Sequence, residues 1–306
     1  MTRKVDVLGI GCAAIDRIIH IYGVPPTDGK AVVVGEALNF GGLTATALAA
    51  AARLGAKCQF AGRLGSDPDS VAVTRDLRRA GVLVSRETWS QDARPVRSTV
   101  IISLDTGMRT IYFTDPTESG AHPAMRDDLV RRARVLFLDG YGFEGSLRAA
   151  CIARDAGVPI VADFEATTDV RFRELLDLVD HLVLPRSFAQ ELTGTLDVTA
   201  ALHELWNDSR KLVAVTSGAA GCWAMVEDMN AIHVPAHRVD VVETLGCGDV
   251  FHGAYAAALA FGYSPLDGIG FANSAAGLKA ARFGTREGLP NRAEVEALLA
   301  SSDLEA

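Results

Sequence analysis

The chain has 306 residues, of which 49% are hydrophobic and 22% charged, with 29 glycines and 11 prolines. This composition is typical of a globular protein and excludes a disordered or collagen-like polymer. The formal net charge is −8 and the sequence has no basic stripe, which argues against nucleic acid or anionic lipid as a partner.

No apolar run approaches the ~18 residues that a membrane span needs, so no membrane partner is expected. The opening, MTRKVDVLGIGCAAID, is predicted to be a first strand and not a signal peptide, which indicates a cytoplasmic protein. Five cysteines lie far apart in the sequence without a CxxC pair, so neither a disulfide framework nor a zinc framework is expected.

Short apolar runs alternate with helix-length segments along most of the chain. In chain order, the pattern predicts a strand over residues 5–9, a helix over 43–54, a strand over 59–62, a helix over 70–80, strands over 135–139, 160–163, 181–184 and 212–216, and helices over 249–261, 264–282 and 291–300. This alternation predicts an α/β protein with a doubly wound, mostly parallel sheet and helices on both faces.

Two regions are β-rich but lack intervening helices, and they predict a small second sheet. Its four strands are expected over residues 17–22, 31–35, 96–104 and 109–113. Such a sheet would lie over the carboxyl edge of the main strands, where open α/β sheets bind ligands, and would act as a lid. The predicted division is a core of residues 1–16, 36–94 and 115–306 and a lid of residues 17–35 and 95–114. Exposed strand edges on a lid favour a homodimer formed through it.

The first strand runs into a GxGxxA motif, Gly9-Ile-Gly11-Cys-Ala-Ala14, with Glu36 further on as a candidate ribose ligand. This pattern raises the alternative of a nicotinamide-dependent oxidoreductase. The dinucleotide fingerprint must open a helix, however, and the residues after Ala14 have a strand pattern that ends at Pro25.

A second motif, Gly246-Cys247-Gly248-Asp249, precedes an alanine-rich helix. Free N–H groups at a helix start can form an anion hole, and an ionised carboxylate beside them can act as a general base in phosphoryl transfer. The alternative interpretation is an aspartate that caps a helix after a glycine turn.

Two further features have both a binding and a structural interpretation. Gly41 and Gly42 precede the helix over 43–54, where they either expose the main chain to a substrate or form a tight turn. Asp16 follows the first strand, where it either accepts hydrogen bonds from a polyol or caps a turn. His233 and His237 are separated by Pro235, so they share no helical face and predict no zinc site.

Together these segments resemble the PfkB or ribokinase-like carbohydrate kinases. The resemblance rests on Gly41-Gly42, on Gly62-Arg-Leu-Gly65-Ser-Asp67 and on the segment ETLGCGDVF over residues 243–251, where the family has Asp-Thr-x-Gly-Ala-Gly-Asp. It spans nearly the whole chain. It implies a ribokinase-like fold and an ATP-dependent phosphotransferase that acts on a hydroxyl of a sugar or sugar-like polyol.

The resemblance also implies roles for single residues. Asp249 matches the general base, and Gly246, Cys247 and Gly248 match the anion hole. The matching nucleotide-binding residues are Thr216, Gly218, Gly221 and Asn273. The substrate-binding residues are expected to be Asp16, Lys30, Gly41, Gly42, Thr46 and Arg109. ATP would bring Mg²⁺, for which no ligands are assigned, because Arg186-Ser-Phe-Ala189 stands where the family often has Asn-x-x-Glu.

Departures from the family pattern bear on the ion and on the substrate. Many members bind K⁺ near the late motif, and Glu243 in place of the family's aspartate argues against that ion. Thr46 replaces a common substrate-binding asparagine and Leu43 a lysine of ribokinases, which argues against ribose. Lys30 resembles a lid lysine of members that phosphorylate sulfofructose, so an anionic ketose is an alternative substrate. A protein that binds a sugar or nucleotide without catalysis is a further alternative.

Overall fold

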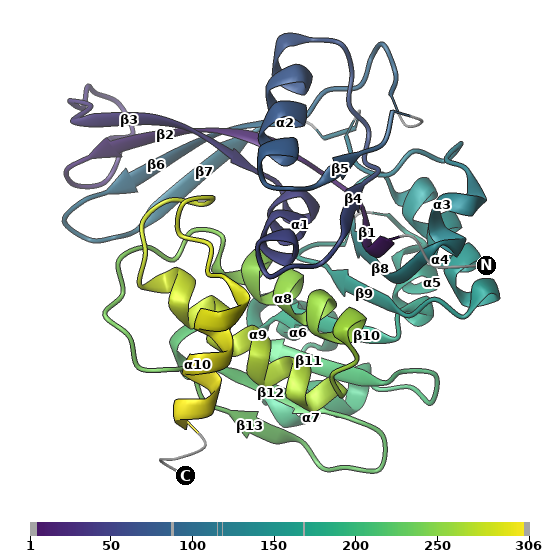
Figure 1. The fold of residues 1–306 in the computed structure, drawn as a ribbon. Coiled ribbons are helices and arrows are strands. Elements are labelled where there is room, and N and C mark those ends of the chain that lie inside the picture. Colours follow the sequence, from purple (N-terminus) through teal and green to yellow (C-terminus); the bar gives the residue numbers. More distant parts are fainter. Residues whose placement is uncertain (1–4, 87–88, 115, 118, 168, 303–306) are drawn as a thin grey trace.

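The structure of the chain, a computed structural model, describes residues 5–302 apart from 87–88, 115, 118 and 168. The strands of its main sheet lie in the order β13-β12-β11-β10-β9-β8-β1-β4-β5 (Figure 1). Pairing is parallel from β11 to β5 and antiparallel for β12 and β13. The strands are β1 (Val5–Ile10), β4 (Cys58–Phe60), β5 (Leu83–Val84), β8 (Ala133–Asp139), β9 (Ile160–Asp163), β10 (His181–Pro185), β11 (Leu212–Thr216), β12 (Cys222–Met225) and β13 (Ile232–Val234).

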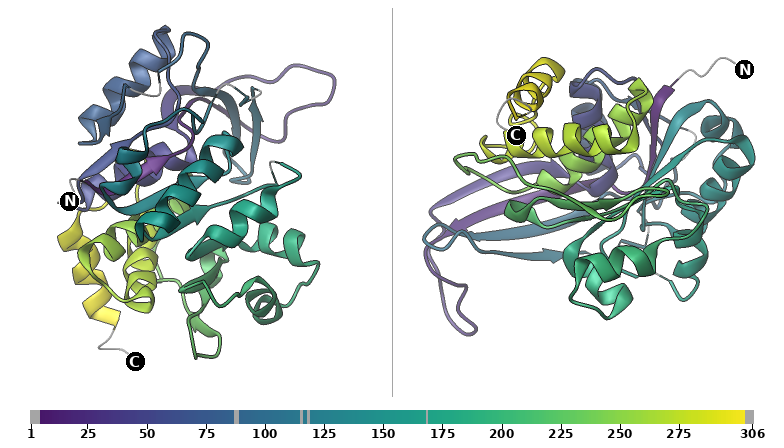
Figure 2. Two further views of the ribbon diagram at one scale, coloured as in Figure 1. Left: turned by 90° about the vertical axis from the view of Figure 1, so that its right-hand side faces the viewer. Right: turned by 90° about the horizontal axis from the view of Figure 1, so that it is seen from below.

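Helices cover both faces of this sheet (Figures 1 and 2). One face carries α1 (Leu43–Arg53), α2 (Pro68–Arg79), α8 (Cys247–Phe261), α9 (Pro265–Ala280) and α10 (Arg292–Ser302). The other carries α3 (Asp127–Arg131), α4 (Phe143–Ala156), α5 (Phe172–Leu178), α6 (Arg186–Thr193) and α7 (Val198–Leu205). Each face packs its own buried cluster, because successive strand residues such as Val135 and Leu136 point to opposite sides. The predicted doubly wound fold is confirmed.

A smaller sheet extends from the carboxyl edge of the main sheet (Figure 1). In the described part of the chain its strand order is β3-β2-β6-β7, with β2 and β6 parallel and the other pairs antiparallel. The strands are β2 (Ala14–Ile21), β3 (Gly35–Gly41), β6 (Val96–Ser103) and β7 (Arg109–Phe113). Because β2 follows closely after β1, this lid starts where strand β1 of the core ends.

One expectation for this region is wrong, while the strand pattern expected after Ala14 is confirmed. The predicted strand over 31–35 is an exposed loop with the strand beginning at Gly35, because the valines at 32–34 have β propensity but the residue pairing with β2 starts at Gly35. The N–H of Val34 still donates to the carbonyl oxygen of His20 at 2.9 Å. The GxGxxA motif leads into strand β2 and not into a helix, so no helix N-terminus faces a pyrophosphate there and the nicotinamide alternative is excluded. The division into core and lid stays a prediction, and its limits at residues 1, 115 and 306 lie outside the described residues.

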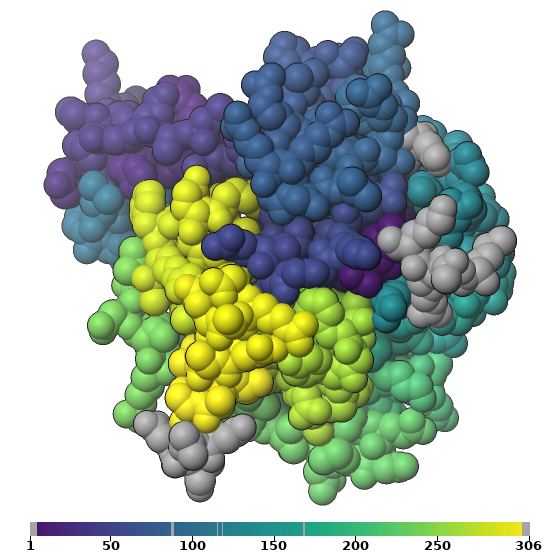
Figure 3. All heavy atoms as spheres, in the orientation of Figure 1, coloured from purple at the N-terminus to yellow at the C-terminus, as the bar shows by residue number. Residues whose placement is uncertain are grey.

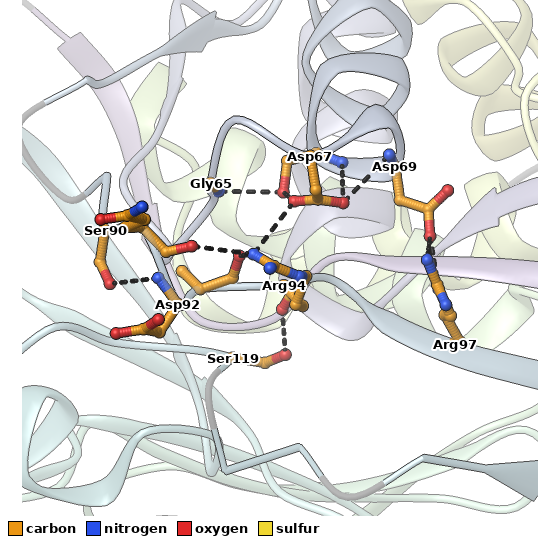
Figure 4. Close-up of polar contacts among 11 residues, drawn as sticks. Gly65, Asp67, Asp69, Ser90, Asp92, Arg94, Arg97 and Ser119 are labelled. Atoms are coloured by element: carbon orange, nitrogen blue, oxygen red, sulfur yellow. Dashed lines mark hydrogen bonds and ion pairs between the residues drawn. The ribbon is translucent and has the colours of Figure 1, made fainter.

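The first lid residues of β6 are tied to the start of α2, as Figure 4 shows. Asp67 caps α2 by accepting from the N–H groups of Asp69 and Ser70, and it forms a 3.7 Å ion pair with Arg94. Asp69 pairs with Arg97 of β6. Charged contacts on one end of β6 therefore connect the lid to a helix of the core.

Candidate active site

The site forms where α8 begins beneath the lid. Gly246 adopts a left-handed conformation with φ 79° and turns the chain into the helix, so that the first N–H groups of α8 lack partners within the helix. Close packing of α8 on α1 depends on Gly253, because a Cβ there would lie 2.0 Å from the carbonyl oxygen of Ala47. The start of α8 also lies close to α1. A Cβ placed on Gly246 would lie 3.7 Å from Cγ2 of Thr46 on α1 and 3.9 Å from Oδ2 of Asp249.

His252 fixes this helix start against the sheet. Its Nδ1 lies 2.9 Å from the carbonyl oxygen of Gly248 and 3.3 Å from Oδ2 of Asp163, and its Nε2 lies 3.0 Å from the carbonyl oxygen of Val183. The imidazole is buried, and burial lowers its pKa. The first turn of α8 therefore has a side-chain link to the ends of β9 and β10.

Asp249 lies in the first turn of α8 and keeps a partly accessible surface. Burial, followed by the charges of Asp163 and Glu165, raises the pKa of Asp249 well above its usual range. The guanidinium of Arg286 opposes this effect, and Asp16 adds to it. Carboxylates from separate parts of the chain thus converge on the space around Asp249.

Two buried aspartates, Asp139 and Asp163, end neighbouring core strands, and their environments differ. Asp139, at the end of β8, accepts from the N–H of Cys12 at 2.7 Å, from Oγ1 of Thr44 at 2.8 Å and from the N–H of Tyr141 at 2.9 Å. It therefore joins the end of β1 to the start of α1. Asp163, at the end of β9, is buried, and its Oδ1 has no hydrogen-bond partner among the described residues.

Asp16 lies on β2 at the inner end of the lid. Its Oδ1 accepts from Oγ of Ser98 on β6 at 2.5 Å, and its Oδ2 would lie 2.1 Å from a Cβ placed on Gly41. Gly42 has φ 92°, and a Cβ there would lie 2.5 Å from the Cα of Ala13. Both glycines are therefore required by backbone packing and by the aspartate, whatever else they contact.

Arg286 is a site residue that sequence reasoning missed. It follows α9 in a turn, and its Nε lies 3.0 Å from Oδ2 of Asp76 while its Nη1 donates to Oγ1 of Thr46 at 3.2 Å. Its positive charge lowers the pKa of both Asp16 and Asp249. No local pattern marks it, because its partners come from α1, α2 and the lid.

In the space-filling view, residues near the C-terminal end, in yellow, and residues of the α2 region, in blue, lie beside the exposed part of α1 (Figure 3). A groove of about 700 Å³ lies there, lined by Asp76, Arg79 and Arg286 among others. Arg286 thus reaches from this groove toward the start of α8.

The predicted nucleotide-binding residues line one pocket of about 640 Å³, which also reaches the start of α8. Its lining includes Thr216, Gly218, Gly221, Asn273, Cys247 and Gly248. Asn273 is held by its own hydrogen bond, from Nδ2 to the carbonyl oxygen of Pro235 at 2.6 Å. Two of the three residues of the predicted anion hole, Cys247 and Gly248, therefore line the same pocket as the nucleotide candidates.

Two of the predicted substrate-binding residues lie elsewhere. Arg109, on β7, lines this 640 Å³ pocket, and its Nη1 lies 3.5 Å from Oγ1 of Thr244 in the loop before α8. Lys30 is exposed on the loop that joins β2 to β3 at the outer end of the lid (Figure 2). The strand β2 separates it from Asp16, because the loop follows the opposite end of that strand.

The sequence pattern of pfkB family carbohydrate kinases matches residues 4–292. The chain belongs to the PfkB family. It is 27% identical to a fructokinase from Oryza sativa, over 98% of this chain and 99% of that protein. It is 21% identical to a 5-dehydro-2-deoxygluconokinase from Shouchella clausii, over 97% of this chain and 96% of that protein.

Among solved structures, a ribokinase from Arabidopsis thaliana complexed with ribose and ATP superposes with a TM-score of 0.84. It is 25% identical and covers 98% of this chain and 99% of its own. The chain is therefore a sugar kinase with the ribokinase-like fold. No helix in the described residues has the length and apolar character needed to cross a membrane.

Proposed function

We propose that this PfkB kinase transfers the γ-phosphoryl group of ATP to a hydroxyl of a sugar or sugar-like polyol, with Asp249 as the general base. The supporting observation is the position of the α8 start. Cys247 and Gly248 line the pocket that includes Thr216 and Asn273, while Gly246 lies beside Thr46, the residue that accepts from Arg286. A phosphoryl group that passes between two bound substrates needs such a position.

In the proposed reaction, the oxygen of the sugar hydroxyl attacks the γ-phosphorus as the bond to the β-phosphate oxygen breaks. The hydroxyl proton passes to the carboxylate of Asp249, and ADP and a sugar phosphate ester are the products. The N–H groups of Gly246 and Gly248 would stabilise the charge on the transferred group, because they are oriented before the reaction. The N–H of Cys247 donates to the carbonyl oxygen of Thr244 at 3.2 Å and would have to leave it to take part. Asp16 would accept hydrogen bonds from the other sugar hydroxyls.

The proposed Mg²⁺ site lies beside the carboxylate of Asp163. Mg²⁺ in kinases is held by one or two carboxylates together with phosphate oxygens and water, and it neutralises charge on the phosphates. The unpartnered Oδ1 of Asp163 and the nearby, exposed Glu165 fit that description. The described residues hold no group of three or more His, Cys, Asp or Glu side chains arranged for a metal.

An anionic sugar is the second candidate substrate, and Arg286 is the observation that favours it. The guanidinium lies next to Thr46 and affects the pKa of Asp16, so a cation is present where a sugar would bind. Lys30, which suggested this substrate class from the sequence, lies at the outer end of the lid and does not support it.

The proposed function is tested by measuring ADP release from ATP with fructose, ribose, 5-dehydro-2-deoxygluconate and sulfofructose, each with product analysis. We expect sustained ADP release with at least one sugar and a phosphate ester as product. Sugars or ATP that raise the melting temperature without any ADP release above the sugar-free rate would instead establish a binding protein.

The pH dependence of turnover is expected to depend on Arg286. Its charge lowers the pKa of Asp249, so Arg286→Gln should raise that pKa further and move the acidic limb of kcat/KM to higher pH. Arg79→Gln, in the same groove but exposed, is the control and should leave the limb in place. An unchanged limb in Arg286→Gln, with its melting temperature retained, contradicts the assignment of Asp249 as the base.

We also propose a homodimer formed through the lid. All residues of β7 are exposed, and Leu38, Ile111, Tyr112 and Phe113 are large apolar side chains on the lid with 46% to 63% of their surface accessible. Exposed apolar strands at a sheet edge are usually covered by another segment or another chain. Sedimentation of the chain as a monomer at micromolar concentration would contradict this.

A further inference from the structure

Lys279, at the end of α9, is a buried charge that the proposed chemistry does not use. Its side chain is 0% exposed, although lysine is rarely buried without a partner. Nζ lies 3.6 Å from Oε2 of Glu243 and 3.4 Å from the carbonyl oxygen of Arg282. Because the Glu243 side chain is itself only 14% exposed, this ion pair is shielded from solvent.

This pair joins the loop before α8 to the end of α9. Oε2 of Glu243 also accepts from the N–H of Gly284 at 2.8 Å, and the N–H of Glu243 donates to the carbonyl oxygen of Ala280 at 3.1 Å. The turn around Gly288 encloses the lysine stem, because a Cβ there would lie 3.1 Å from Cδ of Lys279. The ammonium is therefore held in one place by contacts on several sides.

The charge of Lys279 reaches the proposed anion hole. Burial raises the pKa of the Cys247 thiol, and Lys279 is the largest influence in the opposite direction. Thr285, from the turn that encloses the lysine, would lie 4.0 Å from a Cβ on Gly246. A fixed cation behind the loop strengthens the attraction of its N–H groups for an anion in front of them.

The residues around Glu243 do not fit the K⁺ ion that many PfkB kinases bind near this loop. The carboxylate of Glu243, which stands where the family has an aspartate, already has the Lys279 ammonium and the Gly284 N–H at the same oxygen. A second cation at that oxygen would be repelled by the ammonium, and burial makes this repulsion stronger than in water.

We propose that the ammonium of Lys279 is the built-in cation of the loop over 243–246, so that sugar phosphorylation by this chain does not depend on K⁺. This inference rests on the proposed anion hole at 246–248. Lys279 is a positioning residue in this account, because it acts on the transferred group through the loop.

The first test uses the unmodified chain in buffers of equal ionic strength that contain K⁺, Na⁺ or tetramethylammonium. Turnover is expected to agree within about twofold among the three, and the melting temperature should not respond to K⁺ specifically. A K⁺-specific rise in either quantity overturns the proposal. The melting measurement needs no sugar, so it remains decisive if no kinase activity is found and the proposed function itself fails.

The second test removes the ammonium with Lys279→Ala, which also leaves space for a small cation. The expected result is a fall in kcat of about 10-fold or more with little change in the KM for ATP. Methylammonium or NH₄⁺ should restore part of kcat and raise the melting temperature with saturation, while tetramethylammonium is too large to do so. Lys279→Arg should retain more turnover than Lys279→Ala, because it keeps the charge.

Lys211→Ala is the matched control, since its ammonium pairs with Glu227 at 3.1 Å on the surface. It should show the wild-type response to every cation. Full turnover of Lys279→Ala in tetramethylammonium contradicts the inference, as does loss of turnover that no small cation restores in a folded variant. If Lys279→Ala does not fold, the cation comparison on the unmodified chain still decides the question.

Discussion

Replacement of Asp249 by asparagine is expected to lower kcat by about 10³-fold while ATP binding is retained. The amide keeps the shape of the carboxylate but cannot take the hydroxyl proton, and general-base groups contribute 10²–10⁴-fold to rates. Steady-state kinetics and ATP titration of the variant measure both quantities. Asp240→Asn, an exposed aspartate in the loop before α8, is the matched control and should retain the wild-type kcat.

The same substitution is expected to stabilise the fold at neutral pH. The folded-state pKa of Asp249 is raised, so ionisation of this carboxyl disfavours folding at every pH above its unfolded value. Asp249→Asn removes that cost, and its melting temperature should exceed that of the wild type at pH 8. The difference should disappear below about pH 4, where the carboxyl is protonated in both states. Equal melting temperatures of the variant and the wild type at pH 8 would show that ionisation of this carboxyl does not destabilise the fold.

Replacement of Asp16 by asparagine is expected to raise the KM for the sugar by about 10- to 100-fold, because a hydrogen bond to a charged acceptor contributes about 1.5–3 kcal/mol. The KM for ATP should stay unchanged. Since the charge of Asp16 also raises the pKa of Asp249, the acidic limb of kcat/KM should move to lower pH, opposite to the shift in Arg286→Gln.

Glu36→Gln is the control for this variant. Glu36 lies on the neighbouring lid strand β3 and pairs with Arg17 at 2.7 Å, with 54% of its side chain exposed. Its loss should leave both KM values and the pH profile unchanged. An unaltered sugar KM in Asp16→Asn would remove this residue from the substrate site.

Much of the core could be predicted because its signals are local. Apolar runs such as residues 135–139 mark strands buried on both faces, and β8 was observed at Ala133–Asp139. The start of α8 could be placed from glycines followed by an alanine-rich run, within two residues of the observed boundary at Cys247. The resemblance carried by the same motifs identified the family, and the match over residues 4–292 confirms it.

The acids at the ends of β8 and β9 could have been predicted as site candidates from the sequence. Asp139 and Asp163 each close an apolar strand, and such positions lie at the edge where α/β sheets bind ligands. The sequence could not show that Asp139 is the one whose oxygens accept from the backbone and that Asp163 keeps an unpartnered oxygen. Cys12, Thr44 and Tyr141 come close to Asp139 only in the folded chain.

The sequence by itself determined the main parallel strands, the helices that flank Asp249 and α1, the family, and the positions of the glycine turns and of Asp249, because periodicity and turn chemistry act over a few residues. Only the tertiary structure decided which distant charges meet. Arg286 contacts Thr46 across 240 residues, Lys279 finds Glu243, and Arg109 rather than Lys30 reaches the loop before α8. These meetings depend on helix packing and on the register of the lid strands, which side-chain patterns along the chain do not encode locally.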